Sequence, residues 1–346
     1  MHPIDLRSDT VTLPTNEMLE AISKAELGDD VFQEDPTVNK LEHLAAKTFN
    51  KESAIFMPSG TMANLVAVLT HCQRGDEVIL GDQSHTFLYE AGGISSFGGV
   101  HSRQIKNYDD GTMSLEDIKN SIRKKDVHFP PSRLVCLENT HNRCFGMPLD
   151  INYINKVSEI VKNNSMMLHV DGARIFNAAA ALNKSVAELT SEVDSVSFCL
   201  SKGLSAPSGS LLCGKKEFIE KARFNRKALG GGMRQSGILA AAGIVALNEM
   251  PKKIINDHKN ASNLAKGLNA ISGISIDLEK VKTNIIYFKL DHSKIDSVTL
   301  INSMLKKNIK FFELGPNWFR LVTHAGINEE DIEHVLIQFK DLFSKI

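Results

Sequence analysis

The feature that most constrains the fold of this chain is a series of short, nearly all-apolar segments that alternate with helix-forming segments. Strands that are apolar on both faces are typical of a mostly parallel sheet buried between two layers of helices. We therefore predict an α/β fold with a mostly parallel sheet and helices on both faces. The predicted strands include 76–81, 133–140, 166–174, 194–201 and 208–214, and the predicted helices include 36–49 and 150–164.

The pattern changes after Pro251, which follows a long apolar helix. A strand at 284–290, a helix around 295–307 and a strand at 318–324 form a second, α+β pattern. We predict that residues 1–30 form an N-terminal arm and the start of the large domain. Residues 31–250 are predicted as the rest of the large domain, and 251–346 as a smaller C-terminal α+β domain.

Composition argues against several classes of protein. The chain has 40 Lys and Arg against 41 Asp and Glu, so nucleic acid and anionic membranes are not expected as partners. Five cysteines with no C-x-x-C pair are typical of reduced thiols. The N-terminus lacks the apolar core of a signal peptide, and the longest apolar stretch, 238–247, is too short to span a membrane. We expect a soluble, cytoplasmic protein.

Polar residues follow the predicted strands, at the edge where parallel sheets bind ligands. Ser59, Gly60 and Thr61 lie at a turn from a strand into a helix. Free backbone N–H groups and the helix dipole make such a turn an anion site, although a plain helix N-cap explains the same residues. The G-x-x-x-x-G-K and G-x-G-x-x-G nucleotide motifs are absent.

Asp171 and Lys202 each end an apolar strand, where a charge is costly unless it is paired. Structural ion pairs, with Arg174 as the candidate partner of Asp171, would meet that need. A desolvated lysine is also a usable nucleophile for carbonyls. With a phosphate site, the two residues make up the fixtures of pyridoxal phosphate: an amine for the Schiff base and a carboxylate for the pyridine nitrogen. His85 is placed to cover the ring, or is a surface-loop histidine.

Seven motifs, in order over nearly the whole chain, resemble the low-specificity L-threonine aldolases of the aspartate-aminotransferase fold type, fold type I of the pyridoxal phosphate enzymes. They are LRSDTVT at 6–12, GDDVFQEDPTV at 28–38, SGTMANLVA at 59–67, LENTHN at 137–142, HVDGARIFNA at 169–178, LSKGL at 200–204 and GGGMRQSGILAAAG at 230–243. The resemblance implies cleavage of L-threonine, L-allo-threonine and related β-hydroxy-α-amino acids to glycine and an aldehyde. Departures from the residues common in the family fall at Phe32, Thr86, Cys144 and Phe145.

The resemblance also implies roles at the cofactor. Lys202 would form the Schiff base, Asp171 would pair with the pyridine nitrogen and His85 would stack on the ring. Gly60 and Thr61, with Ser59, would hold the phosphate, and Arg234 would add a charge to it from a neighbouring subunit. No metal is implied.

At the substrate, the same resemblance implies that Ser8, Arg174 and Arg320 bind the carboxylate, with Lys227 as a basic position nearby. For Arg174 a simple bridge to Asp171 or to the cofactor stays open. The general base is His85 or His128, acting directly or through a water, and we favour His85.

Two alternatives remain at this point: a β-eliminating lyase or aminotransferase on the same fold, and a protein that binds the cofactor without turnover. The family implies a homotetramer with active sites at a dimer interface, and the apolar, glycine-rich segment 230–247 is compatible with burial against a neighbour. The family's place is in amino-acid metabolism, in threonine catabolism and glycine biosynthesis.

Overall fold

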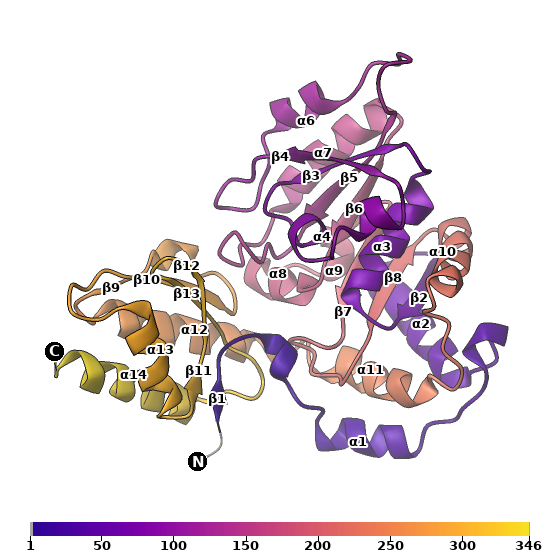
Figure 1. The fold of residues 1–346 in the computed structure, drawn as a ribbon. Coiled ribbons are helices and arrows are strands. Elements are labelled where there is room, and N and C mark those ends of the chain that lie inside the picture. Colours follow the sequence, from indigo (N-terminus) through magenta and orange to yellow (C-terminus); the bar gives the residue numbers. More distant parts are fainter. Residues whose placement is uncertain (1–2, 346) are drawn as a thin grey trace.

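A seven-stranded sheet lies at the centre of the larger part of the molecule in the computed structural model, which describes residues 3–345 (Figure 1). Its order is β2-β8-β7-β6-β5-β3-β4, and within this sheet only β8 runs against the other strands. The prediction of a mostly parallel sheet is thus confirmed. The strands are β2 (Ser53–Met57), β3 (Glu77–Gly81), β4 (His101–Ile105), β5 (Ser132–Glu138), β6 (Met167–Asp171), β7 (Ser195–Cys199) and β8 (Ser210–Gly214).

Helices cover both faces of this sheet, because successive apolar residues of each strand point to opposite sides. Ile79 of β3 packs in one core with α2 (Pro36–Phe49), α7 (Ile151–Asn163), α8 (Ile175–Leu182), α9 (Val186–Leu189) and α11 (Gly237–Glu249). Val78 and Ile55 belong to cores on the other side, built with α3 (Gly60–His71), α5 (Gly93–Ser96) and α10 (Lys216–Ala228). Two short helices, α4 (His85–Leu88) and α6 (Leu115–Ser121), lie in the connections around β3 and β4.

Helix α2 begins where local sequence chemistry predicts it. The Asp35 carboxylate accepts hydrogen bonds from the backbone N–H groups of Thr37 and Val38, and Pro36 occupies the first helical position. The same carboxylate also accepts from the N–H groups of Gly28 and Gly237. One capping residue therefore also ties the chain before α2 to the start of α11.

The smaller part of the molecule is an antiparallel sheet of order β12-β13-β10-β9 with helices packed on it. Its own core contains Phe288, Phe311, Phe319 and Phe339. The elements are α12 (Ile254–Asn269), β9 (Ile274–Ser275), η3 (Leu278–Lys280), β10 (Ile285–Leu290), α13 (Ser297–Leu305), β11 (Ile309–Lys310), β12 (Phe312–Gly315), β13 (Trp318–Val322) and α14 (Glu329–Phe343). This confirms the predicted α+β pattern.

The N-terminal segment joins the two parts. β1 (Ile4–Asp5) pairs in parallel with β11, and the short helix η1 (Asp9–Val11) follows it. Farther on, α1 (Asn16–Ser23) packs against α11 of the large part, and the short helix η2 (Asp30–Phe32) precedes α2. No helix in residues 3–345 has both the length and the apolar character that a membrane crossing needs.

Candidate active site

Lys202 lies in the turn that joins the antiparallel strands β7 and β8. Its backbone carbonyl accepts hydrogen bonds from the Thr12 hydroxyl at 3.1 Å and from the Ser205 N–H at 2.8 Å. The side chain is half-buried, and its ammonium group has no hydrogen bond or ion pair within the described residues. The turn is therefore held in place from both sides, while the amine makes no hydrogen bond in residues 3–345 and only its charge interacts with that of Asp9.

Asp171, at the end of β6, is a buried carboxylate without a cationic partner in hydrogen-bond contact among residues 3–345. Its oxygens accept hydrogen bonds from the Asn64 side-chain amide at 2.9 Å and from the Ala173 N–H at 3.0 Å. A buried carboxylate that meets only neutral donors is costly unless a positive group or a proton approaches it. The site thus favours a cationic group beside Asp171.

His85 begins α4 and lies close to Asp171. Its Nδ1 is 2.9 Å from Glu90 Oε1, and its backbone N–H donates to Glu138. One ligand atom each from His85, Glu90 and Asp171 lie within 4.8 Å of one another. Burial lowers the pKa of His85, but the Glu90 hydrogen bond and the Asp171 charge raise it above its ordinary value. Burial, aided by the Asp171 charge, also raises the pKa of Glu90.

Ser59, Gly60 and Thr61 form the N-terminus of α3, as the sequence predicts. The Ser59 hydroxyl accepts from the Met62 N–H at 3.2 Å, so it is a helix N-cap. Gly60 passes close to β7, since a Cβ added to it would lie 2.8 Å from Cys199 Sγ. The remaining free N–H groups of a helix of this length, together with its dipole, also suit an anion, so the cap and the anion site are compatible.

Two buried arginines come from different parts of the molecule: Arg174 precedes α8 of the large part, and Arg320 is on β13 of the small part. Arg174 donates two hydrogen bonds of 2.7 Å to Asp9, so its ion-pair partner within the described residues is Asp9 and not Asp171. Arg320, on β13, donates to the Asn142 side chain at 2.7 Å and to the Arg7 carbonyl at 2.9 Å, while its buried Nε–H has no partner within residues 3–345. Burial, and then the charge of Arg174, lower the pKa of Arg320.

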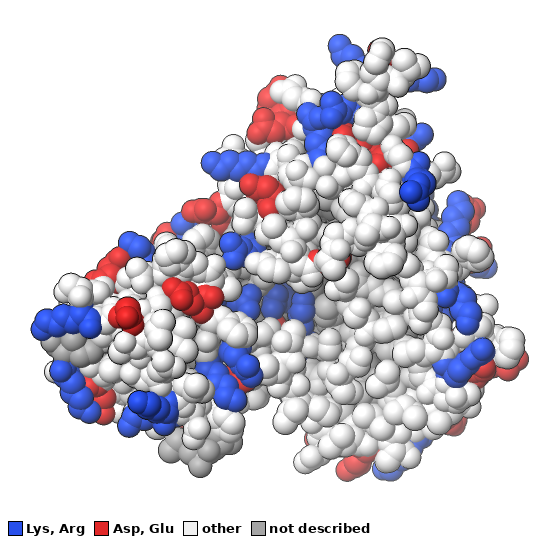
Figure 2. All heavy atoms as spheres, viewed as in Figure 1, with Lys and Arg blue, Asp and Glu red and all other residues white. Residues whose placement is uncertain are grey.

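Ser8 is next to this pair, with its hydroxyl 3.4 Å from Asp9 Oδ1 and accepting from the Thr10 N–H at 3.2 Å. Figure 2 shows a hollow between the two parts of the molecule, with Lys and Arg atoms at its floor. An unsatisfied Nε–H on Arg320, near the charge of Arg174, is an arrangement that suits a carboxylate.

Three of the residues that the sequence singles out lie apart from this group. His128 is in an exposed loop before β5, with Nδ1 2.6 Å from Asp126. Lys227 is exposed near the end of α10. Arg234 is exposed, forms an ion pair with Asp29 at 2.9 Å and lies over the Phe32 ring. Within one chain's described residues, none of the three has a hydrogen bond, ion pair or ring contact with Lys202, Asp171 or His85.

Four further residues hold the site together, and sequence reasoning assigned none of them a role: Asp9, Asn64, Glu90 and Asn142. Three of them stand inside motifs quoted above, so their position is a usable signal: Asp9 in LRSDTVT, Asn64 in SGTMANLVA and Asn142 in LENTHN. Glu90 lies in none of these motifs and carries no local signal, because its partner Asn64 is 26 positions away in sequence.

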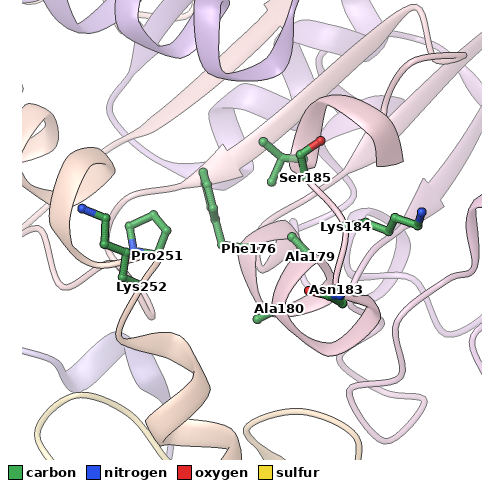
Figure 3. Close-up of a pocket in the computed structure, with 9 residues that line it drawn as sticks. Phe176, Ala179, Ala180, Asn183, Lys184, Ser185, Pro251 and Lys252 are labelled. Carbon is green, nitrogen blue, oxygen red and sulfur yellow. The ribbon is translucent and has the colours of Figure 1, made fainter.

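A pocket of about 500 Å³ lies elsewhere, between α8 and the start of the segment leading to α12 (Figure 3). It is lined by Phe176, Ala179, Ala180, Asn183, Lys184, Ser185, Val186, Pro251 and Lys252. None of the residues described above lines it, so it is separate from the candidate site.

The chain is similar to known proteins in both sequence and fold. The family model described as beta-eliminating lyase matches residues 5–291. A probable low-specificity L-threonine aldolase 2 from Arabidopsis thaliana is 48% identical, with 98% of this chain and 97% of that protein covered. A solved structure of Leishmania major threonine aldolase has a TM-score of 0.84 at 19% identity, covering 99% of this chain and 100% of that one. A structure of SPT with PLP has a TM-score of 0.77 at 19% identity, covering 98% and 87%. At these identities the two structures show the shared fold.

Proposed function

The chain belongs to the beta-eliminating lyase family and, within it, to the low-specificity L-threonine aldolases, and on that basis we propose how its residues carry out the reaction. The protein is a pyridoxal phosphate enzyme that cleaves L-threonine or L-allo-threonine, and related β-hydroxy-α-amino acids, to glycine and an aldehyde. The observation that carries the residue assignment concerns two neighbouring strands: within residues 3–345 the Lys202 amine, which makes no hydrogen bond, follows β7, and the buried Asp171 carboxylate, which accepts hydrogen bonds only from neutral donors, ends β6.

The residues present fit the cofactor. A protonated pyridine nitrogen is the cation that Asp171 lacks, and the N-terminus of α3 with Ser59, Gly60 and Thr61 suits its phosphate. Lys202 would bond to its aldehyde carbon, and His85 would cover one face of its ring. When bound, the cofactor supplies a ring that accepts the electron pair left on the α-carbon.

Arg174 and Arg320 would bind the substrate carboxylate, with Ser8 beside them. Arg174 is already held by two hydrogen bonds to Asp9, and Arg320 by Asn142 and Arg7. Because both guanidinium groups are fixed before substrate arrives, the carboxylate would be bound in one orientation. That orientation decides which bond of the α-carbon is broken.

His85 would take the proton of the β-hydroxyl, directly or through a water. The C–O bond then becomes the carbonyl of the aldehyde, the Cα–Cβ bond breaks, and its electron pair goes to the α-carbon, which later takes up a proton to give glycine. His128 is the other candidate base. Its exposed loop position within one chain favours His85.

We further propose a homotetramer with active sites at a dimer interface. The exposed Arg234 and Lys227 support this, since they could reach a neighbouring subunit's site while lying outside their own chain's site. All five cysteines are free and buried, which supports a location in the reducing cytoplasm. The protein would act there in threonine catabolism and glycine biosynthesis.

Replacing Lys202 with alanine tests the assignment. The wild-type protein should be yellow and bleach with borohydride. K202A should lose the absorption that comes from the bond between Lys202 and the cofactor, and it should lose all turnover of the two threonine diastereomers. The matched control is Lys184→Ala, at a half-exposed lysine that follows the end of α8, and it should change neither. Near-normal turnover by K202A would refute the role of Lys202.

A further inference from the structure

Glu90 is a buried carboxylate beside His85 and Asp171 for which the reaction has so far required no role. It follows α4, and its side chain is only 2% exposed. Its Oε1 accepts from Asn64 Nδ2 at 2.8 Å and lies 2.9 Å from His85 Nδ1, while its Oε2 has no partner within the described residues. Burying a second carboxylate next to Asp171 costs folding free energy. A group buried at such a cost is expected to have a function, and its contact with His85 indicates which one.

Asn64 fixes which groups around Glu90 donate and which accept. Its side-chain oxygen accepts from the Ser197 hydroxyl at 2.7 Å, so its amide nitrogen faces the carboxylates. That nitrogen has two hydrogens, and it donates to Glu90 Oε1 and to Asp171 Oδ2. Both of its donors are therefore used.

The contact between Glu90 and His85 then has one natural reading. In its ionised form the Glu90 carboxylate only accepts hydrogen bonds, so the facing ring nitrogen, Nδ1, then carries a hydrogen. In a neutral imidazole with Nδ1 protonated, the lone pair is on Nε2. The ring is also held at its backbone, since the His85 N–H donates to Glu138 at 2.7 Å.

We propose that Glu90 is a positioning residue that holds His85 in the Nδ1-protonated tautomer with its ring fixed, so that Nε2 is the atom that accepts the β-hydroxyl proton. The transfer step rests on the proposed function, whereas the tautomer rests on the contacts alone. Nε2 takes one proton, directly or through a water, and returns it later in the same turnover. Glu90 itself gains and loses none.

The charges that face His85 agree with this arrangement. They are Glu90, Asp171 on β6 and Glu138 on β5, all carboxylates, with the Tyr89 ring 5.6 Å away. The pKa of His85 is raised because the Glu90 hydrogen bond and these charges outweigh burial. Removing the charge of Glu90 should therefore lower the pKa of His85 and leave less of the ring able to hold the proton it accepts.

Two substitutions separate hydrogen bonding from charge. Glu90→Gln keeps an oxygen that accepts from Asn64 and from Nδ1–H, but removes the charge. Glu90→Ala removes the acceptor as well. We expect Glu90→Gln to keep the tautomer and lower the pKa of His85, and Glu90→Ala to shift the ring to the Nε2-protonated form.

The tautomer is measured by ¹⁵N NMR of the ring nitrogens in protein labelled at histidine, with and without bound cofactor, the His85 signals being assigned by their loss in His85→Gln. His128 is the internal control: its Nδ1 also faces a carboxylate, that of Asp126, but it is exposed and should not respond to changes at Glu90. An Nε2-protonated His85 in the wild-type protein would overturn the proposal.

Turnover gives the second readout. Glu90→Ala should lower kcat by about 100-fold while the KM for L-threonine changes less than threefold, because Arg174 and Arg320 are untouched. In Glu90→Gln the acid limb of the pH profile should move to lower pH. An unmoved limb in Glu90→Gln contradicts the proposal. A protein with the Nδ1-protonated tautomer that cleaves neither threonine diastereomer would instead contradict the proposed function, and the transfer step with it.

Discussion

The buried ion pair between Asp9 and Arg174 makes a quantitative prediction. Asp9 is fully buried and Arg174 nearly so, and the pair shares two hydrogen bonds of 2.7 Å. Asn284 adds a weaker contact to Asp9 at 3.3 Å. Burial alone would raise the pKa of Asp9, but the Arg174 charge and hydrogen bonds lower it to about 2.

Asp9→Asn keeps the shape of the side chain and removes its charge, leaving Arg174 buried without a counterion. Breaking a buried pair from one side costs about 3–5 kcal/mol. The pKa shift of Asp9 from 3.8 to about 2 corresponds to ~2.5 kcal/mol, which is of the same order. Because the folded pKa is lowered, this stability is present above pH 3.8 and is lost as the pH falls through about 2.

The change also affects the substrate site. Without Asp9, Arg174 is no longer held by two hydrogen bonds, and the repulsion between Arg174 and Arg320 is no longer offset. We expect the KM for L-threonine to rise at least tenfold, about 1.4 kcal/mol of lost carboxylate binding.

The assay is urea unfolding at pH 7, with steady-state kinetics on L-threonine. Glu329→Gln removes one partner of an exposed pair with Lys259 and is the control; it should leave both the unfolding midpoint and KM unchanged. If Asp9→Asn behaves like that control, the reasoning about this pair is wrong.

Two further substitutions follow from buried carboxylates. Burial and the Asp9 charge raise the pKa of Asp257 from 3.8 to about 7, so the folded protein should lose stability as the pH rises from about 4 to 7. In urea unfolding, the free energy of unfolding of Asp257→Asn should equal that of the wild type near pH 4 and exceed it by up to ~4 kcal/mol at pH 8. Glu138 accepts hydrogen bonds from the backbone N–H of His85 at 2.7 Å and from that of Asn142 at 2.8 Å. Glu138→Gln should therefore lower the free energy of unfolding by about 1–3 kcal/mol, and it should raise KM because Asn142 holds Arg320. An unchanged free energy of unfolding would contradict this.

Local chemistry was enough to predict the elements that carry their own signal. The apolar strands, the Asp35–Pro36 start of α2 and the Ser59 cap of α3 depend on residues within a few positions of each other. The turn that carries Lys202 follows from two adjacent apolar segments with glycine, serine and proline between them.

The partners of the site residues depend on the fold and could not be predicted in this way. The sequence offered Asp171 as the neighbour of Arg174, but the chain brings Asp9 to it from 165 positions away. Asn64 meets Asp171 across 107 positions, and Glu90 across 26. Side chains of a parallel sheet meet at one edge only after crossovers are complete, and no local pattern records which ones meet. The role of His128 stays a prediction.

The central claim is that the enzyme breaks the Cα–Cβ bond of its substrate and not the bond between Cβ and the hydroxyl oxygen. The most direct test is to identify the products that the cofactor-loaded protein forms from L-threonine. The account predicts glycine and acetaldehyde in equal amounts, and neither from K202A. Ammonia with a keto acid in place of glycine would contradict it and favour a β-eliminating lyase.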